Sequence, residues 1–142
     1  MNTDALVIEA RSWIGTPYLH QASLKGAGTD CLGLIRGIWR SLHGCEPEAV
    51  PAYTPDWAEP AKDERLWQAA QRCFAEHSLC DEALGDVLLF RMARGAIAKH
   101  LGIQVTVGGC ASFVHAYSRH GVLETPLSLP WRNRVVARFS FP

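Results

Sequence analysis

Cys31 is the residue of this sequence best placed to act as a nucleophile. It lies where a loop containing Gly26 and Gly28 gives way to a predicted helix, and the preceding Asp30 suits the N-cap position. Free N–H groups at a helix start stabilise a thiolate, the reactive form of cysteine, so we expect a lowered pKa for this thiol. The alternative is that Cys31 is only a small buried residue at a helix start, as most free cysteines are.

Two histidines far along the sequence are predicted to lie together, as a base and its partner. His100 begins a strand of alternating residues and shares a face with Gly102, whose missing side chain leaves room for an imidazole. If residues 108–109 form a two-residue turn, Gly102 falls opposite His115, and the histidine Cα atoms lie about 7–8 Å apart. His115 would then orient His100, as the third member of a catalytic triad does. The alternative is two half-exposed histidines on a solvated sheet face.

The other residues that could carry chemistry favour weaker interpretations. Cys73, His77 and Cys80 could ligate a metal, but a zinc site needs a fourth ligand, and Cys73 fits the apolar face of a helix better. The glycines of residues 26–28 lack the preceding strand and the spacing of a phosphate-binding loop. We therefore expect neither a metal nor an organic cofactor. Three further histidines are predicted to be solvated, although the first could line a cleft: His20, His43 and His120.

Three helices are predicted in the first half of the chain. The first covers residues 3–14, with Thr3 as its cap. The second, residues 31–42, is apolar around nearly its whole circumference, which is typical of a central helix. The third, residues 64–76, has one apolar face.

Two segments between these helices lack a periodic pattern. Residues 18–29 are predicted to form a loop. Residues 47–60 are rich in proline and are predicted to be an extended surface segment, whose Tyr53 and Trp57 could cover part of the molecule.

After Gly85 the apolar pattern changes to a period of two, which indicates strands. The long alternating strand is expected to be buried on one face only. Five strands are predicted: residues 87–90, 100–107, 111–117, 122–125 and 134–139. Helices followed by antiparallel strands make this an α+β chain.

Length and composition limit the functions that the chain could have. It has 142 residues, enough for one domain, and 14 basic residues balance 14 acidic ones. Zero net charge argues against a nucleic acid or an anionic membrane as partner. No apolar run is long enough for a membrane span, and no signal peptide is recognised, so we expect synthesis in the cytoplasm. The five cysteines lack short paired spacing, which argues against a disulfide framework.

Five short motifs in register give the sequence a resemblance to the NlpC/P60 cysteine peptidases. The resemblance extends from about residue 10 to residue 116. The matching motifs are Gly15-Thr16-Pro17-Tyr18, Asp30-Cys31-Leu32-Gly33-Leu34-Ile35, Gly85-Asp86-Val87-Leu88-Leu89-Phe90, His100-Leu101-Gly102-Ile103 and Phe113-Val114-His115-Ala116.

The resemblance implies a fold, an activity and a set of site residues. The family has a papain-like α+β fold, here with N-terminal helices packed on an antiparallel β-meander and residues 1–142 as one catalytic domain. Its members cleave amide bonds in bacterial cell-wall stem peptides, often next to D-glutamate or diaminopimelate. By resemblance Cys31 is the nucleophile, His100 the general base and acid, and His115 the orienting residue. Tyr18 and Asp30 are expected to bind the oxyanion or the substrate.

The sequence departs from the common family pattern around the cysteine. Leu32 stands where many members have serine, and Leu19-His20-Gln21 replaces a frequent Trp-Gly-Gly. The run from Cys31 to Gly37 resembles the branch found in phages and prophages, which implies phage-tail proteins as partners and a place in a phage or phage-like particle.

Two other functions remain open at this point. The same fold could support an acyltransferase or amidase acting on a γ-glutamyl or D-amino-acid amide. Alternatively, the chain could be a non-catalytic tail-assembly component that kept the domain for its shape.

Overall fold

The computed structural model describes residues 2–50, 53 and 63–142, and it confirms the predicted α+β class. None of the helices in the described part of the chain is long and apolar enough to cross a membrane. The elements are α1 (Thr3–Ser12), β1 (Ser23–Leu24), β2 (Gly28–Thr29), α2 (Cys31–His43), α3 (Arg65–Cys73), β3 (Ala75–His77), β4 (Val87–Phe90), β5 (His100–Thr106), the 3-10 helix η1 (Gly108–Cys110), β6 (Ser112–Tyr117), β7 (Gly121–Pro126), α4 (Leu129–Arg132) and β8 (Val135–Ser140).

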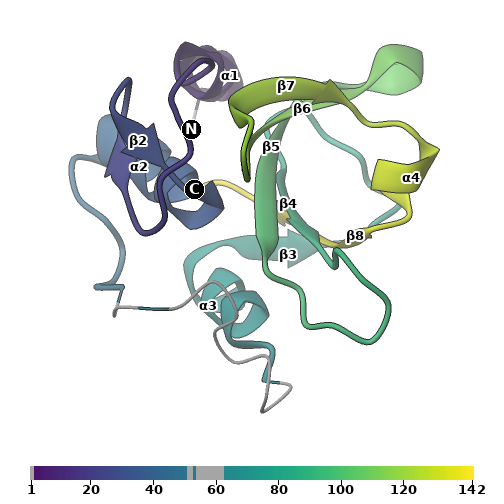
Figure 1. The fold of residues 1–142 in the computed structure, drawn as a ribbon. Helices are drawn as coiled ribbons and strands as arrows, with labels where there is room; N and C mark the ends of the chain where they lie inside the picture. The colour runs from purple at the N-terminus through teal and green to yellow at the C-terminus, as the bar shows by residue number, and fades with distance from the viewer. Residues whose placement is uncertain (1, 51–52, 54–62) are drawn as a thin grey trace.

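The main sheet is antiparallel and has the strand order β3-β8-β4-β5-β6-β7 (Figure 1). Strands β4 to β7 form the predicted meander. The last strand does not extend it. Instead β8 returns to the opposite side of β4 and separates it from β3, pairing with both.

The sheet has a packed layer on each face. Helices α1, α2 and α3 bury an apolar core against one face, which includes Leu101 and Ile103. Trp131 of α4 and buried Phe90 and Phe113 form a second cluster on the other face. In Figure 1, α1 and α2 lie on one side of the sheet and α4 on the other. The expectation that the long alternating strand is buried on one face only is therefore wrong, because this second layer covers the polar face of β5.

Local hydrogen bonds explain where the helices differ from prediction. The cap of α1 is Asn2, not Thr3, because the Asn2 side chain accepts from the Asp4 N–H at 2.9 Å. Helix α3 ends at Cys73, since Phe74 adopts an extended conformation and residues 75–77 pair with β8. The loop predicted at residues 18–29 contains the short hairpin of β1 and β2. Most of the surface segment predicted at residues 47–60, including Trp57, lies outside the described residues.

The turn between β5 and β6 also differs from prediction. Residues 108–110 form a 3-10 turn rather than a two-residue hairpin, and the pairing shifts between Gln104 and Thr106. Beyond this irregularity Ile103 pairs with Val114, which is the register expected from the simpler turn. The register shift near Gln104 offsets the extra residue of the 3-10 turn, so the strands pair near His100 as predicted.

Helix α2 approaches α1 closely at Gly37. A Cβ atom there would lie 2.2 Å from Cζ2 of the buried Trp13 ring. We predict that Gly37→Ala lowers the free energy of unfolding by about 1–3 kcal/mol, because overpacking outweighs a gain of about 1 kcal/mol in helix propensity. Urea unfolding measures the difference.

Gly109→Ala is the control, because an added Cβ atom at Gly109 meets nothing within 4 Å. A Gly37→Ala protein as stable as the wild type would contradict this account of the α1–α2 contact.

Candidate active site

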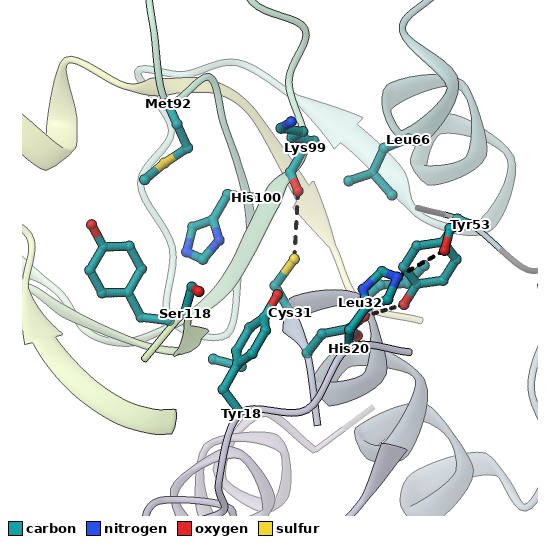
Figure 2. A pocket seen from close by; sticks show the side chains of 13 residues that line it. Tyr18, His20, Cys31, Leu32, Tyr53, Leu66, Met92, Lys99, His100 and Ser118 are labelled. Atoms are coloured by element: carbon teal, nitrogen blue, oxygen red, sulfur yellow. Dashed lines mark hydrogen bonds and ion pairs between the residues drawn. The ribbon is translucent and has the colours of Figure 1, made fainter. Parts of the chain in front are cut away.

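A cleft of about 200 Å³ opens where the start of α2 meets the start of β5 (Figure 2). Its walls bring together residues from the loop before α2, from α2 itself and from the sheet. Among the lining residues are Tyr18, His20, Cys31, Tyr53, Lys99 and His100. Cys31 and His100 are thus gathered in one cleft.

Asp30 and the helix start fix the position of Cys31. The Asp30 carboxylate caps α2 as predicted, with Oδ1 accepting from the Gly33 N–H at 2.7 Å. The partly buried Cys31 thiol donates to the carbonyl oxygen of Lys99 at 3.5 Å. Because Lys99 directly precedes His100, this contact ties the first residue of α2 to the beginning of β5.

The structure contradicts the expected lowering of the Cys31 pKa. Backbone N–H groups near Sγ favour the thiolate, but burial and the Asp30 carboxylate outweigh them and raise the pKa of this thiol to about 12. Burial, His115 and Arg134 lower the pKa of His100 to about 3. In the free protein at neutral pH, both groups are therefore uncharged.

His100 and His115 are hydrogen-bonded to each other. Nε2 of His100 lies 2.7 Å from Nδ1 of His115, and both residues are buried. Gly102 lies beside them, where a Cβ atom would come within 2.9 Å of the Phe113 ring and 3.4 Å of the His115 Cβ. The structure thus brings the two histidines together as predicted, with the Nδ1 edge of His100 left for the cleft.

Thr125 adds a third group to the hydrogen-bonded pair of histidines. Its Oγ1 lies 2.8 Å from Nε2 of His115. The residue follows the β7 partner of His115 by two positions, so both side chains project from the same face of the sheet. Sequence analysis missed Thr125, because a threonine in a half-polar strand has no distinguishing pattern.

Aromatic rings enclose the histidine pair on the face away from α2. The Trp131 ring centroid lies 6.0 Å from that of His100 and 5.1 Å from that of His115. Arg134 packs over Trp131 at 5.1 Å. Burial, with a smaller contribution from His120, lowers the pKa of His115 to about 4. This enclosure keeps the pair neutral and shields its hydrogen bond from water.

The Asp30 carboxylate is occupied by contacts within the protein. Besides capping α2, its Oδ2 accepts from the Gln21 N–H at 2.8 Å and from the Tyr53 hydroxyl. His20 lines the cleft and contacts the Tyr53 carbonyl oxygen at 2.9 Å. An oxyanion needs hydrogen-bond donors, whereas a carboxylate accepts, so the geometry gives Asp30 a positioning task.

Tyr18 lies on the cleft wall near Cys31. An isolated bridge to Thr29 holds its backbone, and Figure 2 shows the side chain beside Cys31. Burial, reinforced by Cys31 and Asp30, raises the pKa of Tyr18 to about 12. Its hydroxyl is protonated at neutral pH and can donate a hydrogen bond.

The weaker candidates are placed elsewhere. Cys73 is partly buried on α3, Cys80 is exposed, and His77 contacts Asp86 at 2.9 Å. Among residues 2–50, 53 and 63–142, no group of three or more His, Cys, Asp or Glu side chains is arranged to hold a metal ion.

The pKa of Cys31 predicts how this thiol responds to pH. We expect slow alkylation by iodoacetamide at pH 7, because little thiolate is present, and a rate that rises about tenfold per pH unit up to pH 10. Mass spectrometry of peptides from the labelled protein follows Cys31, with the exposed Cys110 as internal control. A rate for Cys31 that has already levelled off at pH 7 would contradict the neutral resting state.

Comparison with solved structures identifies the fold. The NlpC/P60 domain of the peptidoglycan hydrolase SagA has a TM-score of 0.67 and 22% identity, with 99% of this chain and all of that chain covered. An NLP/P60-family protein from Staphylococcus aureus, described as similar to a lipoprotein, has a TM-score of 0.64 and 20% identity. An NlpC/P60 family protein from Bacillus cereus has a TM-score of 0.64 and 19% identity.

The match covers 99% and 97% of this chain, but only 41% and 39% of the S. aureus and B. cereus chains, respectively. No protein-family model and no curated protein matches the sequence. The structural likeness confirms the fold expected from the sequence motifs: this chain has the NlpC/P60 fold.

Proposed function

We propose that the protein is a cysteine peptidase that hydrolyses amide bonds in the stem peptides of bacterial cell walls. The observation that carries this proposal is the cleft that holds the Cys31 thiol and the His100 imidazole, with His115 bonded behind His100. The NlpC/P60 fold, which SagA shares, supports the cell-wall peptide as substrate.

The first step is attack by the Cys31 sulfur on the carbonyl carbon of the substrate. Because thiol and imidazole are both neutral at rest, Nδ1 of His100 takes the thiol proton as the sulfur–carbon bond forms. The carbonyl oxygen gains the negative charge. The N–H groups at the start of α2 and the protonated Tyr18 hydroxyl are the donors available to stabilise it.

The second step releases the amine and then the acid. The His100 imidazolium gives its proton to the leaving nitrogen, which leaves an acyl group on Cys31. His100 then takes a proton from water as the water oxygen attacks the acyl carbon, and it returns this proton to the departing Cys31 sulfur, which restores the neutral thiol and imidazole. The hydrogen bond between Nε2 of His100 and Nδ1 of His115 holds the His100 ring in the required orientation.

The phage-associated role is proposed from the sequence resemblance. The run from Cys31 to Gly37, which resembles the phage and prophage branch, motivates it. In this proposal the enzyme is synthesised in the cytoplasm and reaches the cell wall as part of a phage or phage-like particle.

Replacement of Cys31 tests the reaction itself. We expect Cys31→Ala to abolish hydrolysis of purified muropeptides, because the substitution removes the thiol that forms the acyl intermediate. Mass spectrometry of the products, compared with the wild type, also identifies the bond that is cut. Undiminished hydrolysis by Cys31→Ala would overturn the assignment.

The same assay separates hydrolysis from acyl transfer. With a competing amine present, a hydrolase releases mainly the free acid, whereas a transferase releases mainly the amine adduct. Predominance of the adduct would favour the acyltransferase alternative.

Replacement of His115 tests the orienting role. We expect His115→Ala to lower kcat by about 10²- to 10⁴-fold while measurable activity remains, because the nucleophile and base are still present. Steady-state kinetics on the same muropeptides measures the change, and circular dichroism checks the fold. Wild-type rates in this variant would remove His115 from the mechanism.

A further inference from the structure

The Thr125 hydroxyl lies at the end of a row of hydrogen-bonded groups formed by His100, His115 and Thr125, called the histidine chain below. Oγ1 lies 2.8 Å from Nε2 of His115, whose Nδ1 lies 2.7 Å from Nε2 of His100. Within the described part of the chain, His115 is the only hydrogen-bond partner recorded for this hydroxyl. Thr125 is half-buried, so water can accept the hydroxyl hydrogen while the oxygen faces the ring.

The three groups can share their hydrogens in two ways. Each neutral imidazole ring carries one N–H hydrogen. The two hydrogen bonds that join His100, His115 and Thr125 must therefore point in the same direction. In one direction both rings are protonated on Nε2, and the oxygen of Thr125 accepts. In the other direction Thr125 donates, both rings are protonated on Nδ1, and the hydrogen bonds run toward the cleft.

Only the first direction suits a base at His100. It leaves the lone pair of Nδ1 on the cleft side, where it can take the thiol proton of Cys31. The second direction places a hydrogen on that atom and blocks proton transfer. A side chain that accepts from His115 therefore selects the useful arrangement.

We propose that Thr125 is a positioning residue whose oxygen accepts the Nε2 hydrogen of His115, so that His100 presents an unprotonated Nδ1 to Cys31. This inference rests on the proposed cysteine-hydrolase function for its catalytic consequence. The hydrogen-bond arrangement itself is independent of that function.

The test compares Thr125→Val, which keeps the shape without the hydroxyl, with Thr125→Ser, which keeps the hydroxyl. Two-bond ¹H–¹⁵N spectra of histidine-labelled protein at pH 7 report which ring nitrogen carries the hydrogen. We expect both histidines to be protonated on Nε2 in the wild type and in Thr125→Ser. In Thr125→Val, we expect a substantial Nδ1-protonated fraction of His115.

Kinetics on muropeptides provides the second readout. Loss of one hydrogen bond predicts a decrease in kcat of about five- to thirty-fold in Thr125→Val, with KM unchanged and activity restored in Thr125→Ser. Thr106→Val is the matched control, because the Thr106 hydroxyl bonds to Ser112 and Cys110 without contacting the histidine chain.

Each outcome decides the inference. Nδ1-protonated rings in the wild type, or Nε2-protonated rings retained in Thr125→Val, would overturn it. An equal loss of kcat in Thr106→Val would also overturn it, because the effect would then be general. If the wild type hydrolyses no muropeptide while the ring protonation shifts as expected, Thr125 keeps its positioning role and the proposed function fails.

Discussion

The buried Asp30 carboxylate holds one wall of the cleft together, and the position of Cys31 depends on it. It caps α2 through Gly33 and binds the Gln21 N–H and the Tyr53 hydroxyl. Because every one of these groups donates to the same carboxylate, the helix start, the preceding loop and Tyr53 are fixed relative to one another. The same negative charge also opposes ionisation of the neighbouring Cys31 thiol. The constraint that positions the Cys31 thiol therefore also keeps it neutral.

The opposite wall is organised by backbone register. Pairing of β5 with β6 puts His100 and His115 on one face, and Gly102 beside them has no side chain to force the strands or the Phe113 ring aside. Trp131 then covers the pair on the face away from α2. Burial on this wall lowers the pKa of both imidazoles, so the two histidines are uncharged, as the Cys31 thiol is on the other wall. In the proposed reaction, charges on the thiol and the imidazole would then appear only as the substrate reacts.

The sequence predicted the features that depend on local patterns. These include helix α2 with Cys31 at its start, the Asp30 cap and the shared face of the two histidines. The predicted register is correct near His100 although the predicted turn is wrong, because the irregularity near Gln104 compensates for the 3-10 turn. What the sequence could not predict depends on tertiary contacts: the Tyr53 hydroxyl reaching Asp30, Trp131 covering the histidines, and the net rise in the Cys31 pKa. Each of these depends on how segments far apart in the sequence pack together, which no local pattern encodes.

The return of β8 between β3 and β4 has a consequence for how the molecule folds. Strands β4 to β7 are successive hairpins and can pair as soon as each has been synthesised, so the histidine wall can assemble early. The strand beside β3 in the sheet is β8, with Ala75 paired to Ser140, so β3 gains this strand partner only when β8 arrives. Arg138, buried against Asp86 at 2.9 Å, must enter the interior in that same late event. One edge of the sheet is therefore completed only after β8 has been synthesised.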